Sequence, residues 1–276
     1  MMICEVQGIP IYFETIGKGC PFLVLHGGGG DHRCMINILE PVFAAHPGWQ
    51  RIYPDLPGHG RTPAPEWLTN HDQVLEIILG FIDQVIPGVS YALAGGSRGG
   101  YLAQGVLAKR TAALTGLLLI IPVSSARNRG TVPGKTVLVK DENVWAEMPP
   151  VEAGFMDGYV VQDRKALEDI RRSMPSYELS DRAYQQRIVQ PENYSFSFDV
   201  DEEPAVFDKP ALILAGRQDS MVGYQGSIKL EERFPRGTLA VLDRAGHALP
   251  IEQQPLFRAL VAEWLERVEE NLRTAK

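Results

Sequence analysis

Residues 90–100 read S-Y-A-L-A-G-G-S-R-G-G, and Gly95 to Gly99 match the pattern G-x-S-x-G. The apolar residues before the pattern predict a strand, and the segment after it, to about Arg110, predicts a helix. An abrupt strand-to-helix turn holds its central residue in a strained conformation, and only small neighbours let the two segments approach. The pattern therefore predicts Ser97 as a nucleophile at the carboxyl end of a strand, beside a helix amino terminus.

The chain around this pattern alternates between strand and helix signals. Helices are expected at 35–44, 72–86 and 253–271, the last two from the regular spacing of apolar residues. The segment 116–122 is almost wholly apolar, as expected of a central parallel strand covered on both faces. Repeated strand–helix units predict an α/β fold, with a mostly parallel sheet and helices on both faces. Further strands are expected at 9–16, 21–26, 50–54, 211–216 and 238–242.

The alternation stops at about residue 124 and returns near residue 205. Residues 124–204 are richer in charge, Pro, Tyr and Met, and contain short helical patterns at 163–172 and 180–189. We therefore predict a helical cap at 124–204, inserted after the sixth strand, between the core segments 1–123 and 205–276.

Composition excludes several classes of partner. With 276 residues, 45% of them apolar, the chain can bury the core of one large α/β domain. A net charge of −7 without a basic patch argues against nucleic acid. No apolar run reaches the roughly 18 residues of a membrane span. A small-molecule substrate is the expected partner, and a homodimer is compatible with the sequence.

The three cysteines bear on localisation and on metal binding. Cys4, Cys20 and Cys34 are odd in number, and none forms a C-x-x-C pair. The amino terminus also lacks the basic and apolar regions of a secretory signal. These features predict reduced thiols in a cytoplasm and no thiolate metal site.

A serine hydroxyl becomes a good nucleophile when a base removes its proton. Among six histidines, His247 follows both the proposed nucleophile and the late strands, in A-G-H-A-L-P. We therefore predict His247 as the general base. The histidines at 32, 46 and 71 are expected to be solvated.

The base needs an acid that fixes its tautomer. Asp219 follows the strand at 211–216, so the chain order Ser97, Asp219, His247 is the order of the G-x-S-x-G architecture. No carboxylate follows strand 116–122 before Asp141, which further favours Asp219.

Gly27 to Gly30 follow a strand that ends in His26. Consecutive glycines leave backbone N–H groups uncovered, and we predict an oxyanion hole from the amides of Gly28 and Arg98. A phosphate loop is disfavoured because no G-K-[ST] follows.

Six strings occur in order along the chain: G-I-P-I-Y-F-E-T-I-G, H-G-G-G-G, D-L-P-G-H-G-R-T, G-G-S-R-G-G, G-R-Q-D and G-H-A-L-P. Together they resemble the α/β-hydrolase family from about residue 9 to the end, the predicted cap excepted. The resemblance implies an eight-stranded sheet, a helical lid and hydrolysis through a covalent acyl-enzyme. It names no substrate, because this fold hosts many chemistries.

Two subfamilies are similar but differ at single positions. Proline iminopeptidases usually have Pro where Gly30 stands and Trp where Arg98 stands. Hydrolases that cleave carbon–carbon bonds in dienoate products usually have Trp where Ala248 stands. Both remain alternatives to a carboxylesterase-like serine hydrolase of a small ester, thioester or amide.

Arg98 allows two interpretations. Its guanidinium could bind a substrate carboxylate. Alternatively, its side chain points away and pairs with a local acid while its amide serves the oxyanion hole, and we favour this second interpretation.

Substrate contacts are expected from the glycine loop and the cap, whose aromatic and thioether side chains can line an apolar pocket or pack the cap's own core. The candidates are Gly27, Gly29, Trp145, Met148, Phe155 and Tyr159. No metal or organic cofactor is expected. A small-molecule-binding protein on a hydrolase scaffold is the non-enzyme alternative, and the intact triad argues against it.

Overall fold

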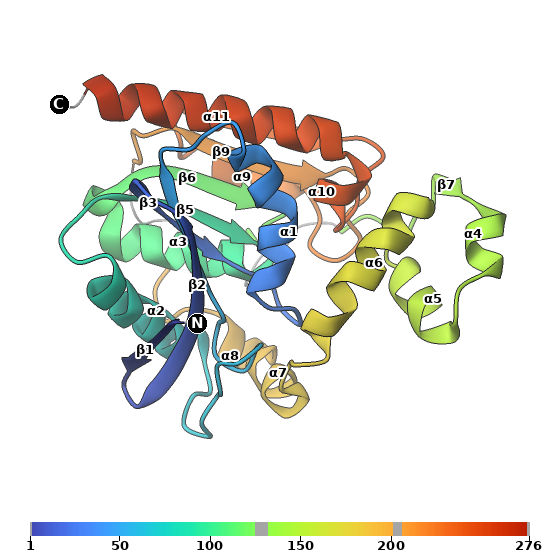
Figure 1. The fold of residues 1–276 in the computed structure, drawn as a ribbon, viewed down its shortest axis with the longest axis horizontal. Coiled ribbons are helices and arrows are strands. Elements are labelled where there is room, and N and C mark those ends of the chain that lie inside the picture. Colours follow the sequence, from blue (N-terminus) through green and yellow to red (C-terminus); the bar gives the residue numbers. More distant parts are fainter. Residues whose placement is uncertain (1, 125–131, 201–205, 275–276) are drawn as a thin grey trace.

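The predicted strands are present in the computed structural model, which describes residues 2–124, 132–200 and 206–274. An eighth strand joins them in one sheet, in the order β1-β2-β4-β3-β5-β6-β9-β10 (Figure 1). The strands are β1 (Met2–Val6), β2 (Ile9–Gly17), β3 (Cys20–Leu25), β4 (Trp49–Pro54), β5 (Tyr91–Gly96), β6 (Leu114–Ile120), β9 (Ala211–Gly216) and β10 (Gly237–Leu242).

The sheet is mostly parallel, as predicted. β2 runs antiparallel to β1 and β4, whereas the strands from β4 to β10 pair in parallel. β1 was not predicted from the residue pattern, and it forms a tight hairpin with β2. Gln7 and Gly8 make that turn with φ of 50° and 79°. Two successive residues with positive φ are typical of a two-residue hairpin, but Gln-Gly is a weak signal for it.

Helices cover both faces of the sheet (Figure 1). α1 (His32–Phe43) and α11 (Gln254–Thr274) pack on one face, and α2 (His71–Val85), α3 (Arg98–Arg110) and α9 (Gln225–Glu231) pack on the other. α1 begins three residues before the predicted start. The reason is a side-chain cap, because Asp31 accepts a hydrogen bond from the amide of Arg33.

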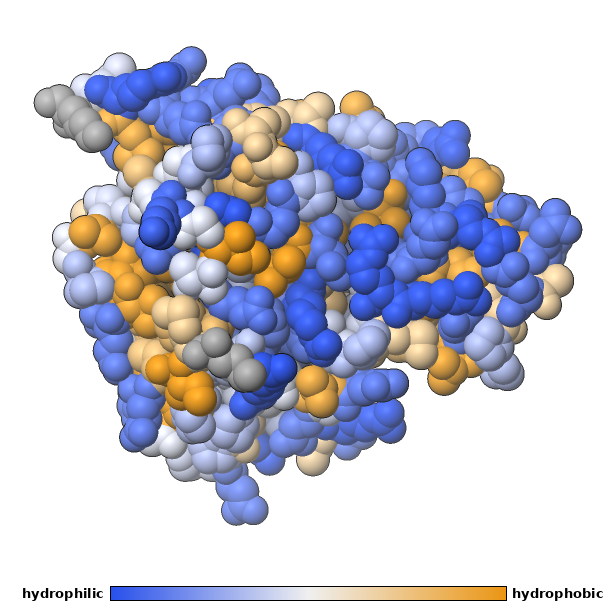
Figure 2. All heavy atoms as spheres, in the orientation of Figure 1, coloured by the Kyte–Doolittle hydropathy of each residue, from blue (hydrophilic) through white to orange (hydrophobic). Residues whose placement is uncertain are grey.

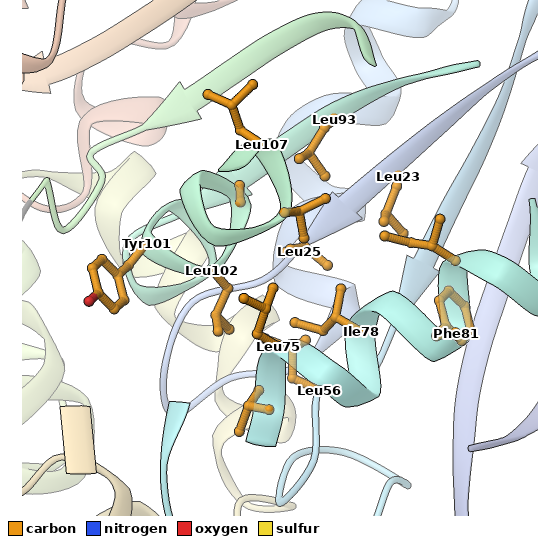
Figure 3. Packing of buried hydrophobic residues seen from close by; sticks show 14 of the residues in the cluster. Leu23, Leu25, Leu56, Leu75, Ile78, Phe81, Leu93, Tyr101, Leu102 and Leu107 are labelled. Atoms are coloured by element: carbon orange, nitrogen blue, oxygen red, sulfur yellow. The ribbon is translucent and has the colours of Figure 1, made fainter. Parts of the chain in front are cut away.

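Each face of the sheet has its own hydrophobic core. Leu25 and Leu93, on neighbouring strands, meet side chains of α2 and α3 such as Leu75 and Leu102 (Figure 3). On the opposite face the fully buried Trp264 of α11 packs near Phe22, with ring centroids 5.8 Å apart. Burial on both faces explains why the central strands have continuous apolar sequences.

Between β6 and β9 the chain forms helices rather than further strands of the main sheet. α4 to α6 form a lobe that projects beyond the sheet in Figure 1, whereas α7 and α8 lie against the main body. The predicted junction at 204 and 205 lies outside the described residues. The bounds are β7 (Val139–Lys140), α4 (Glu142–Ala146), α5 (Pro150–Met156), β8 (Val161–Gln162), α6 (Arg164–Tyr177), α7 (Arg182–Ile188) and α8 (Pro191–Tyr194).

The surface of the projecting lobe is mostly hydrophilic in the view of Figure 2, with hydrophobic residues scattered among polar ones. In the described part of the chain, no helix combines the length and apolar character needed to cross a membrane.

Backbone segments approach one another closely where α3 follows β5. A methyl group on Gly99 would lie 2.4 Å from the carbonyl oxygens of Leu25 and His26. A methyl group on Gly95 would lie 2.3 Å from the carbonyl oxygen of Gly99. Any side chain at either position would force the helix away from the sheet.

We therefore expect Gly99→Ala to lower the free energy of unfolding by roughly 1–3 kcal/mol, the usual range for overpacking. Gly154→Ala is the matched control, because a methyl group there meets nothing within 4 Å and the residue lies inside α5. Alanine should leave that helix unchanged or more stable by up to about 1 kcal/mol. Urea denaturation measures both, and equal midpoints for the two variants would contradict the packing argument.

Candidate active site

Ser97 lies between β5 and α3 in a strained conformation, with φ of 50° and ψ of −117°. A positive φ is rare for a residue with a side chain and must be held by its surroundings. The Ser97 amide donates to the carbonyl of Ile120, and its carbonyl accepts from the amides of Gly100 and Val123. The backbone is thus fixed from the neighbouring strand and from the first turn of α3.

His247 bridges Ser97 and Asp219. Its Nε2 atom lies 3.0 Å from Ser97 Oγ, and its Nδ1 atom lies 2.8 Å from Asp219 Oδ2. The three residues come from loops after β5, β9 and β10, so the sheet brings together positions up to 150 apart in sequence. The structure therefore places the three sequence-predicted residues in one hydrogen-bonded chain.

Asp219 is fully buried and held by its own loop. Its Oδ1 atom accepts from the amides of Met221 and Val222, at 2.9 Å and 3.0 Å. Burial by itself would raise the pKa of Asp219, but the contact with His247 and these amides outweigh it and lower the pKa. An ionised Asp219 favours the His247 tautomer that carries hydrogen on Nδ1 and a free lone pair on Nε2.

The glycine loop after β3 lies beside Ser97. A methyl group on Gly27 would lie 3.2 Å from Ser97 Cβ, so the loop backbone can approach the nucleophile closely. His26 holds this loop, because its Nδ1 atom contacts the Gly27 carbonyl at 2.7 Å and its Nε2 atom accepts from the Leu56 amide at 2.9 Å. His26 is therefore a structural residue of the loop.

Within the described ranges the Arg98 side chain does not pair with an acid, which corrects the interpretation favoured from sequence. It is 5% exposed and donates to Gln185 Oε1 at 2.9 Å, while its second terminal nitrogen lies 2.5 Å from His59 Nε2. His59 Nδ1 faces the Pro57 carbonyl at 2.9 Å, so its Nε2 atom is the acceptor. In the described residues both partners of the guanidinium are neutral.

Three buried histidines surround this cation and are kept neutral. Burial first, and then the charge of Arg98, lower the pKa of His71 to about 3 and that of His59 well below its usual range. Burial lowers the pKa of His26 to about 4.

The predicted solvation of the histidines at 32, 46 and 71 is wrong, since all three are at most 9% exposed. His71 packs against Tyr194, with ring centroids 4.4 Å apart, a contact across the sequence that no local pattern reveals.

A cavity of about 660 Å³ opens above Ser97 and His247. Its lining includes Gly27, Gly28 and Arg98, and also Phe155 and Tyr159 from the helical insert, as predicted.

Three predicted substrate contacts do not line this cavity. Trp145 and Met148 instead pack against the small hydrophobic core of the lobe, beside Val144 and Met156. Gly29, with φ of 87°, faces the ring of Tyr177. Helical spacing gives the residues of one face but does not show which element that face packs against.

Sequence reasoning missed several residues at the site. Asp169, Gln185 and Tyr194 line the cavity from the insert.

Glu252 of α10 (Leu249–Glu252) connects the His247 loop to the insert. It accepts from the amide of Gly246 at 2.6 Å and from that of Val160 at 2.5 Å. Its position five residues after His247 was the available signal, but the partner at Val160 is visible only in three dimensions.

In the part of the chain that the structure describes, one group of side chains has spacing compatible with a metal ion, namely Asp31, His32 and Asp55. Each already has protein partners. Asp31 pairs with Arg33, and Asp55 accepts from the His32 ring at 2.6 Å and from the Arg61 amide at 2.9 Å. The group is therefore explained as a hydrogen-bonded support beneath the loop after β4.

Comparisons with known proteins agree with the fold. A family model described as "Alpha/beta hydrolase family" matches residues 22–259. A pimeloyl-[acyl-carrier protein] methyl ester esterase of Legionella pneumophila (strain Corby) is 24% identical over 93% of this chain and 99% of its own length. A 2-hydroxy-6-oxononadienedioate/2-hydroxy-6-oxononatrienedioate hydrolase of Burkholderia vietnamiensis is also 24% identical, over 93% of this chain and 91% of its own.

Solved structures share the fold. An alpha/beta superfamily hydrolase from Oenococcus oeni PSU-1 superposes with a TM-score of 0.85 and 28% identity, over 98% of this chain and 100% of that one. The esterase RhEst1 from Rhodococcus sp. ECU1013 superposes with a TM-score of 0.75 at 22% identity, over 96% and 98% of the two chains.

The buried neutral histidines make acid sensitivity testable at His71. Because its folded pKa is lowered from 6.5 to about 3, its contribution to stability is complete above 6.5 and is lost as pH falls toward 3. His71→Phe keeps a ring against Tyr194 but does not titrate. From about pH 7 to about pH 5, the free energy of unfolding of the variant should gain about 2 kcal/mol relative to the parent. Chemical denaturation at both pH values measures the difference, and an unchanged gap would show that His71 is not held neutral.

Proposed function

The chain belongs to the alpha/beta hydrolase family, and from this premise we propose that it is a serine hydrolase that cleaves a small ester, thioester or amide through an acyl-enzyme. The observation that carries the proposal is the hydrogen-bonded chain from Ser97 Oγ through His247 to Asp219, at the wall of a cavity. An ester is favoured among these substrates, since several relatives are named esterases.

In the proposed first half-reaction, Ser97 Oγ attacks the substrate carbonyl while His247 Nε2 takes its proton. Asp219 stabilises the imidazolium through the hydrogen on Nδ1. The amides of Gly28 and Arg98 bind the oxyanion of the tetrahedral intermediate, and one such donor is worth about 10²–10³ in kcat. His247 then returns the proton to the leaving alcohol, which leaves an acyl-Ser97.

In the second half-reaction, His247 takes a proton from water, which attacks the acyl carbonyl. Collapse of the second intermediate releases the carboxylic acid and returns the proton to Ser97 Oγ. The cycle uses atoms of the chain, substrate and water, and requires no cofactor chemistry.

We propose that residues 124–204 act as a cap that sets the size of the acyl pocket. Phe155, Tyr159 and Tyr177 support this role, because they line the cavity that Ser97 faces. Cytoplasmic localisation remains a prediction from the free Cys4, Cys20 and Cys34. A homodimer also remains a prediction.

A carbon–carbon bond hydrolase is the second candidate. The observation in its favour is the Burkholderia vietnamiensis relative, which is named as a hydrolase of a dienedioate. Against it, Ala248 stands where that class usually has Trp. The same triad serves either reaction, so the substrate decides between them.

The test is hydrolysis of p-nitrophenyl esters of graded acyl length. Ser97→Ala and His247→Ala should each lower kcat at least about 10³-fold, and Asp219→Asn roughly 10²- to 10⁴-fold. Asp243→Asn is the matched control, because Asp243 is exposed, lies four residues from His247 and accepts a hydrogen bond from Gln218. It should keep activity within about threefold of the parent. Equal activity of the Ser97→Ala variant and the parent would rule out the proposed mechanism.

A further inference from the structure

Among the residues that the structure describes, the guanidinium of Arg98 is a buried charge without a countercharge. The residue is 5% exposed, and its partners, His59 and Gln185, are neutral. Across the described ranges no carboxylate contacts it. Burying an ion without a countercharge costs several kcal/mol, and an anion bound beside it would recover part of that cost.

This charge lies at the wall of the cavity. Gly28 and Gln185, which line the cavity, flank the guanidinium on two sides. A methyl group on Gly28 would lie 3.5 Å from Arg98 Cζ. Since the neighbouring Gly27 packs against Ser97, the guanidinium lies on the side of the cavity where the reacting carbonyl would be held.

The surroundings of the guanidinium do not cancel its charge. His26, His59 and His71 are neutral, for the reasons given above. Among the described lining residues, Asp169 of α6 is a carboxylate, but it interacts with the Tyr159 hydroxyl and with the charge of Arg172 and makes no contact with Arg98. This end of the cavity therefore carries an uncompensated positive charge.

We propose that Arg98 binds a carboxylate of the substrate, so that the hydrolysed ester carries a second, anionic group close to the scissile carbonyl. His59 and Gln185 use two of the five N–H groups of a guanidinium, which leaves donors for a carboxylate. The two neutral partners hold the plane of the guanidinium without neutralising its charge. This inference rests on the proposed hydrolase function, because it names the substrate class of the same site.

The first test compares anionic esters with neutral esters of the same shape. Monomethyl glutarate carries its carboxylate on the acyl side and is paired with its neutral amide, methyl 4-carbamoylbutanoate. Carboxymethyl butyrate carries its carboxylate on the alcohol side and is paired with its neutral amide, carbamoylmethyl butyrate. In the parent protein, kcat/KM for one anionic ester should exceed that of its amide partner by roughly 10-fold or more. A preference for the neutral ester in both pairs would overturn the proposal, whether or not any variant folds.

The variants assign the preference to a residue. Arg98→Met should lower the anionic-to-neutral ratio by roughly 10- to 100-fold, whereas general damage to the fold would lower both rates alike. Arg187→Met is the matched control. Arg187 lies in α7, over the ring of Tyr184 and near Gln185, and is not among the described residues that line the cavity. An unchanged ratio in Arg98→Met, or a ratio lost in Arg187→Met instead, would contradict the assignment.

Calorimetry on Ser97→Ala separates this inference from the proposed function. Glutarate should bind this variant at least about tenfold more tightly than glutaramate, and the added Arg98→Met change should remove the difference. Binding of glutarate through Arg98 without turnover in the parent would retain the subsite and reject the hydrolase. Turnover of neutral and anionic esters at equal rates would retain the hydrolase and reject the subsite.

Discussion

The close contact between β3, β5 and the first turn of α3 is the constraint on which the rest of the site depends. Gly95 and Gly99 let the backbones meet at distances that a side chain would forbid, and the turn between them forces Ser97 into a positive φ. A strained residue persists when its surroundings over-determine it. Here the strain holds the hydroxyl above the sheet while its amide and carbonyl stay bonded to neighbouring segments.

Several buried polar groups around this rigid turn have partners from distant segments. Asp219 has two backbone donors besides His247, and His26 ties the glycine loop to Leu56. Glu252 links the insert to the site in the same way. Its carboxylate accepts from the amide of Gly246, in the His247 loop, and from the amide of Val160, in the insert. The insert is thereby bonded to the loop that carries the proposed base. Arg98 has neutral hydrogen-bond partners but no countercharge among the described residues, and we propose that the substrate provides one.

The sequence was most informative where a local pattern has one structural outcome. Strong apolar runs predicted the central strands, and the order of the motifs predicted which loops meet above the sheet. It was least informative where packing partners are distant in sequence. Trp145 and Met148 have the same character as Phe155 and Tyr159, and Tyr159 packs against the same lobe core. Of these four, however, Phe155 and Tyr159 are the two that line the cavity. The neutral partners of Arg98, at His59 and Gln185, were likewise beyond any spacing argument.

The central claim is that His247 and Asp219 activate Ser97 as a nucleophile. Reaction with a fluorophosphonate probe, followed by mass spectrometry of the digested protein, tests it most directly. If His247 activates Ser97, we expect one adduct, on Ser97, that forms in the parent and is lost in His247→Ala. An adduct on another residue, or none on Ser97 in the parent, would contradict it.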